Sequence, residues 1–244
     1  MSWRLPFFVV AAMGALATAG LWRLLPSLPS RRGAGDILSQ LSLLKSNALM
    51  PLYLMAAVGM AATFAVFTYL SPLLTRITGL NSEGVTLGLM TFGLGSVVGT
   101  IGGGRLSDRY GPKFSMNIAL AGLAMSMAAV LVSAHQPVLI MANLFVWGAF
   151  AFAIPPIMQA TVVLIAQRVA PRVVGTAAGL NVAAFNLGIA GGSFLGGRAL
   201  TSENVLATVY VGLALSVIGL AVVAMYRWSD RPAAVTSRHA LRKL

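Results

Sequence analysis

Charged residues and histidines interrupt this chain at wide intervals, and the segments between them are almost wholly apolar. A helix of about 20 mostly apolar residues crosses the hydrocarbon core of a bilayer. The segments that meet this requirement lie between Arg4 and Arg23, Lys45 and Arg76, Glu83 and Arg105, Lys113 and His135, His135 and Arg168, Arg172 and Arg198, and Glu203 and Arg227. The pattern predicts an all-α polytopic membrane protein with seven transmembrane helices.

The composition supports a membrane protein. Charged residues make up 9% of the 244 positions and apolar residues 58%, with a mean hydropathy of +0.86, whereas soluble domains carry about 25% charged residues. The net charge of +12 comes from basic residues placed singly or in small groups between apolar segments, not from a stripe on a soluble surface. This distribution indicates membrane topology and excludes nucleic acid as a partner. Cysteine is absent, which excludes disulfides and thiolate metal sites.

The basic residues fall on alternate connections between the apolar segments, and loops rich in lysine and arginine stay on the cytoplasmic side. Placing those connections in the cytoplasm leaves only Arg4, Arg76 and Arg198 outside. The cytoplasmic set is Arg23, Arg31, Arg32, Lys45, Arg105, Arg109, Lys113, Arg168, Arg172, Arg227, Arg231, Arg238, Arg242 and Lys243. We therefore expect a multi-pass protein of the cell inner (plasma) membrane, with its amino terminus outside and its carboxyl terminus in the cytoplasm.

The first apolar segment has a second interpretation. Arg4, the short apolar stretch after it and the run Ala17-Thr18-Ala19 are typical of a cleavable signal peptide. Cleavage would put every residue of the cytoplasmic set on the wrong face, so the charge distribution favours a retained helix. A chain that begins outside with an odd number of helices is expected to be the later part of a longer protein.

The stretch GGGRLSDRYGPK, residues 102–113, concentrates charge between the third and fourth apolar segments. Its Asp108-Arg109-Tyr110 triplet matches the triplet that ends the third helix of rhodopsin-like receptors, which also have seven helices and an outside amino terminus. In those receptors the helix is continuous, whereas the flanking Gly102–Gly104 and Gly111 predict a tight turn here. The receptors' proline motif in the seventh helix is also missing, since residues 203–228 contain no proline.

The same stretch resembles the Gly-x-Leu-Ala-Asp-Arg-x-Gly-Arg-Lys loop of the major facilitator superfamily. The matching positions are Gly104, Leu106, Asp108, Arg109, Gly111 and Lys113. Ser107 replaces the usual alanine, and Pro112 replaces a basic residue and so removes one positive contact. Residues 68–75, 92–104 and 175–197 are similar to the efflux branch that includes arabinose-efflux-permease-like and drug–proton antiporters. The resemblance implies a secondary active transporter that exports drug-like or sugar-like molecules by alternating access.

Members of this family have two six-helix halves, and the resemblance implies how this chain is divided. Residues 1–25 form a transmembrane helix of the first half, 26–46 a cytoplasmic linker, 47–227 the six-helix carboxyl-terminal half, and 228–244 a basic cytoplasmic tail. Gly104, Asp108, Arg109, Gly111 and Lys113 form a conformational-switch loop. In it, Asp108 pairs with Arg109 or Lys113, or lies at a helix amino terminus. The expected partners are the lipid bilayer, a small-molecule substrate, and a missing amino-terminal half or partner chain.

Polar residues within the spans mark the candidate substrate path, because such residues face a bundle interior or a water cavity. Phe64, Phe67, Thr68 and Ser71 share one helical face and predict an apolar wall with two hydroxyls. The other candidates are Asn143, Trp147, Gln159, Asn181, Phe185 and Asn186. Ordinary packing between helices explains each of these residues equally well. The spans contain no acidic residue, so a proton-coupling carboxylate is expected in the missing half.

Two further patterns concern backbone geometry. Pro155-Pro156 removes two backbone donors within a span and predicts a helix break that neighbours or water must satisfy. Glycines at four-residue steps between Gly175 and Gly196 predict close helix packing. The spacing Gly93-x-Gly95-x-x-x-Gly99 does not fit a dinucleotide site, and no catalytic or metal-ligand cluster can be assembled, so we expect no enzyme, cofactor or metal. The alternatives to a transporter are a non-transporting remnant or interaction subunit, and a seven-helix receptor.

Overall fold

The computed structural model describes residues 5–24, 42–200 and 204–226 of the chain. The chain divides into two compact units, residues 1–34 and 35–244. Within the first unit, helix α1 spans Leu5–Leu24. Most of the predicted linker 26–46 and the whole predicted tail 228–244 lie outside the described residues. The fold that positions the candidate site is therefore that of the second unit.

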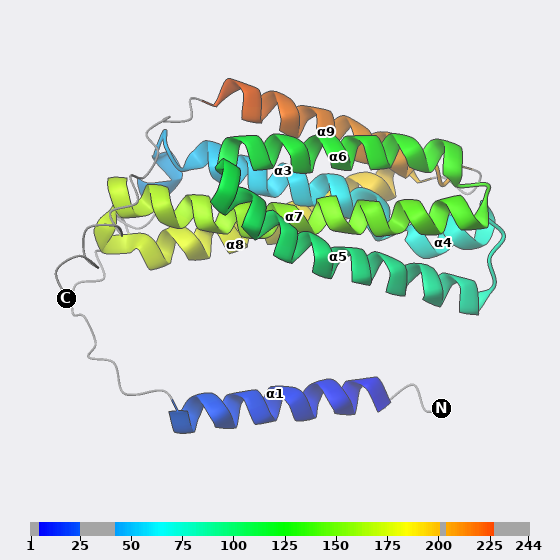
Figure 1. The fold of residues 1–244 in the computed structure, drawn as a ribbon, viewed down its shortest axis with the longest axis horizontal. Coiled ribbons are helices and arrows are strands. Elements are labelled where there is room, and N and C mark those ends of the chain that lie inside the picture. Colours follow the sequence, from blue (N-terminus) through cyan, green and yellow to red (C-terminus); the bar gives the residue numbers. More distant parts are fainter. Residues whose placement is uncertain (1–4, 25–41, 201–203, 227–244) are drawn as a thin grey trace. The chain divides into compact units, whose positions relative to one another are not determined.

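The described part of the second unit is built of helices (Figure 1). They are η1 (Ser42–Lys45), α3 (Met50–Phe67), α4 (Leu70–Arg76), α5 (Ser82–Tyr110), α6 (Pro112–Ser133), α7 (Pro137–Val169), η2 (Pro171–Val173), α8 (Val174–Ala199) and α9 (Ala207–Met225). The pair α3–α4 counts as one span. Together with α1, the described residues contain seven helical segments long and apolar enough to cross a membrane. This confirms the seven spans predicted from the spacing of charges.

Prolines, glycines and one asparagine set the helix ends. Helices α6 and α7 begin at Pro112 and Pro137, where a missing N–H is tolerated because the first turn has no partner for it. Helix α5 begins after Asn81, whose side-chain oxygen accepts a hydrogen bond of 2.9 Å from the Gly84 N–H. Between α5 and α6, Gly111 has a φ of 82°, a backbone conformation that favours glycine. The chain thus reverses at that single residue.

The six spans of the second unit form two consecutive sets of three, with α3–α4, α5 and α6 in one and α7, α8 and α9 in the other. The middle helices are exchanged: α5 packs most extensively on α7, and α8 on α3. The third helices follow the same rule, since α6 packs on α7, α9 packs on α3, and α6 and α9 pack on each other (Figure 1). This arrangement is expected of two structural repeats that form one helical body.

Glycines hold both exchanged pairs at backbone contact. An added Cβ at any of them would overlap backbone atoms of the facing helix. In the α5–α7 pair, Gly95, Gly99 and Gly103 face Phe145, Ala149 and Ala153. In the α8–α3 pair, Gly188, Gly192 and Gly196 face Ala57, Ala61 and Ala65. The predicted packing role of the four-residue glycine steps is confirmed for these α8 positions, whereas Gly175 and Gly179 have open space around them.

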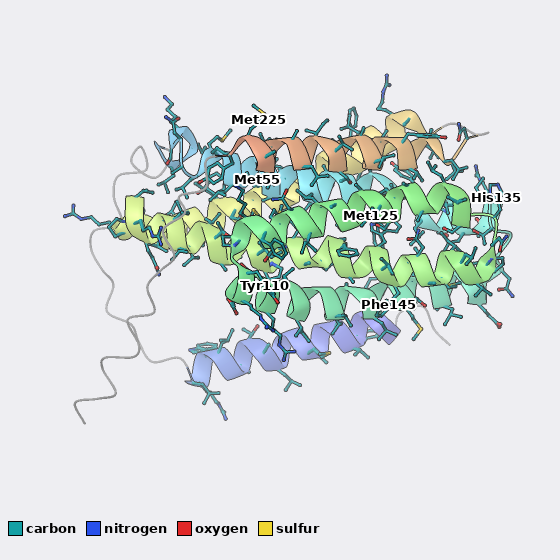
Figure 2. The ribbon with its side chains drawn as sticks, turned by 45° about the horizontal axis from the view of Figure 1, so that its top comes forward. Met55, Tyr110, Met125, His135, Phe145 and Met225 are labelled. Atoms are coloured by element: carbon teal, nitrogen blue, oxygen red, sulfur yellow. The ribbon has the colours of Figure 1, made fainter. Side chains whose placement is uncertain are left out.

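The connections alternate between the two ends of the bundle. Tyr110, at the end of α5, and Met225, at the end of α9, lie toward one end, and His135 lies at the other (Figure 2). Near the first end, the Tyr226 hydroxyl donates to the Ala48 carbonyl oxygen at 2.9 Å and ties the end of α9 to the residues before α3. Burial raises the pKa of Tyr226, which keeps the phenol protonated as the donor.

Candidate functional site

The break between α3 and α4 places polar groups on the face that α3 shares with α8. Thr68 and Tyr69 separate the two helices, and Pro72 has no N–H to offer the Thr68 carbonyl. The Thr68 hydroxyl lies 2.8 Å from the Ser193 hydroxyl of α8, and the Tyr69 hydroxyl donates to the Ser193 carbonyl oxygen at 2.9 Å. Irregular backbone at membrane depth is tolerated where protein covers it or water reaches it. This face is therefore better suited to cover by protein or water than to contact with lipid.

Next to this polar group, aromatic rings from three helices pack together. The ring centroids of Phe64 and Phe67 on α3 lie 5.5 Å apart. Phe67 lies 4.5 Å from Phe92 of α5 and 6.4 Å from Trp147 of α7. Phe92 in turn contacts Phe152 of α7 at 6.0 Å. Phe92 and Trp147 are buried, whereas Phe64 and Phe67 are half-buried, so this cluster presents the two α3 rings toward the surface.

Trp147 is wholly buried, and within the part of the chain that the structure describes its indole Nε1 has no hydrogen-bond partner. An unpartnered buried donor costs about 1 to 3 kcal/mol. Most buried polar groups in proteins are satisfied. Trp147 is therefore an anchor of the aromatic cluster that carries an unused donor.

Asn181 and Gln159 connect α8 to α7 near the end where Tyr110 lies. Asn181 is wholly buried, and its Nδ2 donates to Gln159 Oε1 at 2.7 Å. Its Oδ1 has no partner among the described residues. One turn before Asn181, the Ala177 carbonyl accepts a 3.3 Å hydrogen bond from the Tyr53 hydroxyl of α3. Three helices thus meet at buried polar groups, and one acceptor among them is unused.

The remaining polar candidates make local contacts. Asn143 is buried and donates to the Ser126 carbonyl of α6 at 3.0 Å, which is the helix-packing alternative considered for it. Asn186 is exposed and donates to the Val182 carbonyl of its own helix at 2.9 Å. Phe185 is half-buried beside it, and Ser71 is exposed on α4. Asn186 and Ser71 thus remain accessible candidates for the substrate path.

Helix α7 continues through Pro155 and Pro156, so the predicted helix break does not interrupt it. The prolines free the carbonyls of Ala151 and Phe152, because residues four positions later normally donate to them. The hydroxyl of Thr100 on α5 approaches the Phe152 oxygen at 3.5 Å. Beyond the prolines, Gln159 makes the contact with α8 described above. The proline pair therefore lies between the part of α7 that packs on the α5 glycines and the part bonded to Asn181.

The charged stretch 102–113 differs from the predicted tight turn. Gly102, Gly103 and Gly104 are helical, and α5 continues through Asp108 and Arg109 to Tyr110. The expected loop is reduced to Gly111, and Lys113 already lies in α6. The prediction failed because Gly103 packs against Ala153 of α7, and this contact outweighs the low helix propensity of glycine.

The predicted pairing of Asp108 is also absent. Asp108 is exposed and forms no ion pair or hydrogen bond with any described residue, and Arg109 instead lies 5.2 Å over the ring of Tyr110. The carboxylate is therefore free to bind a group outside the described residues.

Gly111→Ala is expected to destabilise the second unit by about 1 to 3 kcal/mol, because alanine strains the backbone at this φ. Gly104→Ala is the matched control, since Gly104 is helical and has open space around it. The thermal unfolding midpoint of the detergent-purified chain measures both. Equal unfolding midpoints for Gly111→Ala and Gly104→Ala would show that a side chain at residue 111 does not strain the backbone.

Comparison with known sequences identifies the family. The sequence model of the Major Facilitator Superfamily matches residues 1–169 of the chain. The chain belongs to this superfamily. It is 33% identical over 221 residues to the uncharacterized MFS-type transporter YtbD of Bacillus subtilis (strain 168), an alignment covering 91% of this chain and 55% of YtbD. It is also 33% identical over 205 residues to the chloramphenicol resistance protein of Streptomyces lividans, covering 82% of this chain and 50% of that protein.

A third relative is named for sugar efflux. The probable sugar efflux transporter of Helicobacter pylori (strain ATCC 700392 / 26695) is 27% identical over 220 residues, covering 90% of this chain and 55% of that protein. The chain thus spans about half the length of these relatives. The chain is a multi-pass membrane protein of a transporter family, and members of this superfamily are transporters, not enzymes.

Superfamily membership also decides against the receptor interpretation. The tight turn predicted from the flanking glycines does not, because the structure lacks that turn. Asp108-Arg109-Tyr110 does end a continuous helix, as the receptor triplet would. The helix exchange between the two three-helix sets and the family match carry the assignment instead.

Three contributors to the site were missed by sequence reasoning, namely Tyr69, Ser193 and Phe92. Tyr69 and Thr68 precede Ser71-Pro72, and the missing N–H of Pro72 was a usable signal for a break in the helix. Ser193 lies among the α8 glycines and is brought to Thr68 by the glycine contacts with α3. No pattern in the sequence indicates that pairing.

Proposed function

We propose that this chain forms the carboxyl-terminal part of a secondary active transporter that exports small drug-like or sugar-like molecules by alternating access. The observation that carries the proposal is the wall of half-buried aromatic rings and hydroxyls at the α3–α4 break. Such a wall binds an amphipathic molecule, because the rings cover its apolar part and the hydroxyls contact its polar groups. The Helicobacter relative, named as a probable sugar efflux transporter, supports an export function, and the Streptomyces relative, named as a chloramphenicol resistance protein, supports a drug-like ligand.

The wall forms one side of the transport path in this proposal. In transporters built of repeats, the substrate site lies near the bilayer midplane between two helical bodies that move relative to each other. A further six-helix body would form the opposite side: α1 would contribute one of its helices, and a preceding segment or a partner chain would supply the others. The length of the relatives, about twice that of this chain, supports this arrangement.

The switch role is assigned to the turn between α5 and α6. Asp108, Arg109 and Lys113 lie around the single-residue reversal at Gly111, and Gly104 lies on α5 nearby. Because Asp108 has no partner among the described residues, we propose that it binds the opposite body in one conformation and releases it in the other. The proposed topology puts this turn in the cytoplasm, with the amino terminus outside and the carboxyl terminus inside.

Export is tested by the accumulation of radiolabelled chloramphenicol and arabinose in cells that lack or express the intact gene. Expression is expected to lower the accumulation of at least one compound, and Asp108→Ala to restore it to the level of cells without the gene. Glu83→Ala is the control, because it removes the carboxylate at the other end of α5. Accumulation of both compounds that is unchanged by expression would contradict export and favour an interaction subunit.

A further inference from the structure

The hydroxyls at the α3–α4 break differ from an ordinary polar patch in the direction of their hydrogen bonds. A hydroxyl has one hydrogen to donate and two lone pairs. The Thr68 hydroxyl donates its hydrogen to the Phe64 carbonyl oxygen at 2.9 Å. With that hydrogen directed to Phe64, we assign Ser193 as the donor in the 2.8 Å contact between Thr68 and Ser193. The Tyr69 hydroxyl uses its own hydrogen on the Ser193 carbonyl.

All three hydroxyl hydrogens are thus used within this group, which we name the α3–α8 acceptor cluster (Thr68, Tyr69 and Ser193). One lone pair of the Thr68 hydroxyl accepts the Ser193 hydrogen, and the other lone pairs of the three hydroxyl oxygens remain available. The Thr68 carbonyl adds a further acceptor, because the residue four positions later is Pro72. Thr68 is exposed, and Tyr69 and Ser193 are half-buried. The cluster therefore presents acceptors and no hydroxyl donor to whatever molecule approaches it.

The surroundings limit the chemistry of that molecule. The half-buried rings of Phe64 and Phe67 lie directly before Thr68 on α3 and offer an apolar surface. The charged residues that follow the cluster along α4 and α8 are Arg76 and Arg198, both basic. A cation would meet like charge at this end of the bundle and no carboxylate on α3, α4 or α8. A ligand with uncharged hydrogen-bond donors is not repelled by these arginines.

We infer that the α3–α8 acceptor cluster is a subsite for the hydroxyl or amide N–H donors of an uncharged ligand whose apolar part lies against Phe64 and Phe67. The inference rests on the proposed function, since it describes what the export path recognises. It adds a rule of selectivity: the subsite prefers a ligand with donors over the same ligand with those donors capped by methyl groups.

The test compares chloramphenicol, which has two hydroxyls and one amide N–H, with its N-methyl di-O-methyl ether, in which all three donors are capped. Binding to the full chain in lipid nanodiscs is measured by quenching of Trp147, after Trp3→Phe, Trp22→Phe and Trp228→Phe remove the other tryptophans. Trp147 is a suitable reporter because its ring lies 6.4 Å from that of Phe67. Chloramphenicol is expected to bind about threefold to tenfold more tightly than the ether, as for one neutral hydrogen bond.

Variants separate recognition from folding. Thr68→Val keeps the shape and frees the Ser193 hydrogen, so the ratio of the two affinities is expected to fall close to one, and Ser193→Ala should lower it as well. Thr68→Ser keeps the hydroxyl and should retain the ratio. Thr91→Val is the control, because the Thr91 hydroxyl donates to Leu87 within its own helix.

Equal affinities of the unmodified chain for the two compounds, or no saturable quenching by either, would overturn the inference. A ratio unaffected by Thr68→Val and Ser193→Ala would also overturn it. The outcomes also distinguish failure of the proposed function from failure of the proposed subsite. Retained donor preference without any export in intact cells contradicts the proposed function alone, whereas export with equal affinities contradicts the subsite alone.

Discussion

Gly192→Ala is expected to destabilise the second unit by about 1 to 3 kcal/mol, whereas Gly191→Ala should leave its stability unchanged or slightly increased. The two glycines are neighbours in the middle of α8, yet their surroundings are opposite. A Cβ at Gly192 would overlap the Ala61 carbonyl oxygen of α3, and a Cβ at Gly191 would meet no atom within 4 Å. Since the facing atoms belong to helix backbone, the clash is relieved only by separating α8 from α3.

The measurement is the thermal unfolding midpoint of the detergent-purified chain, and fluorescence-detected size-exclusion chromatography is the method that monitors it. Because α8 and α3 also carry Ser193 and Thr68, separation of the helices should reduce ligand binding as well. Gly99→Ala on α5 provides a second case, since its Cβ would overlap the Ala149 carbonyl of α7, and Gly93→Ala on the same helix is its control. Equal midpoints within both pairs would show that the helices are less closely packed than described.

Asn181→Leu is expected to lower stability by about 1 to 3 kcal/mol and to abolish export, because it leaves the amide of Gln159 without its partner on α8. Asn186→Leu on the same helix should have little effect on stability, since among the described residues the Asn186 side chain bonds only to Val182 of α8. The difference in unfolding midpoint between the two variants measures the contribution of the buried amide pair.

A double variant separates packing from transport. Gln159→Met combined with Asn181→Leu replaces both amides with apolar groups of similar size, which is expected to restore most of the stability. If the amides serve the transported molecule or the motion of α7, export stays abolished in the double variant. Recovery of export together with stability would show that the pair only holds α7 to α8, which is the packing alternative for Asn181 and Gln159.

The Asn181–Gln159 pair also shows which features of the site could be predicted from the sequence. Polar residues within apolar spans marked Asn181 and Gln159 as candidates, because such residues rarely face lipid. Their mutual hydrogen bond could not be predicted, since 22 positions separate them. The unused Oδ1 of Asn181 and Nε1 of Trp147 were equally beyond sequence reasoning, because whether a group is satisfied depends on every neighbour.

The charged stretch 102–113 is a case in which local reasoning failed in a specific way. Three consecutive glycines predict a turn when the helix is considered alone. In the folded unit their small size is what lets α5 reach the backbone of α7, and the helix continues. The turn forms at Gly111, where Pro112 follows and the backbone takes the positive φ that glycine allows.

The sequence by itself determined the number of the spans, because the cost of placing charge in hydrocarbon depends on composition along the chain and not on packing. It also determined the family motif, which is a local property. Only the tertiary structure decided which glycines pack against the backbone of a facing helix, which polar groups meet and which remain unpaired. Those properties depend on atoms from helices distant in sequence, and the exchange of middle helices between the two three-helix sets brings these atoms together.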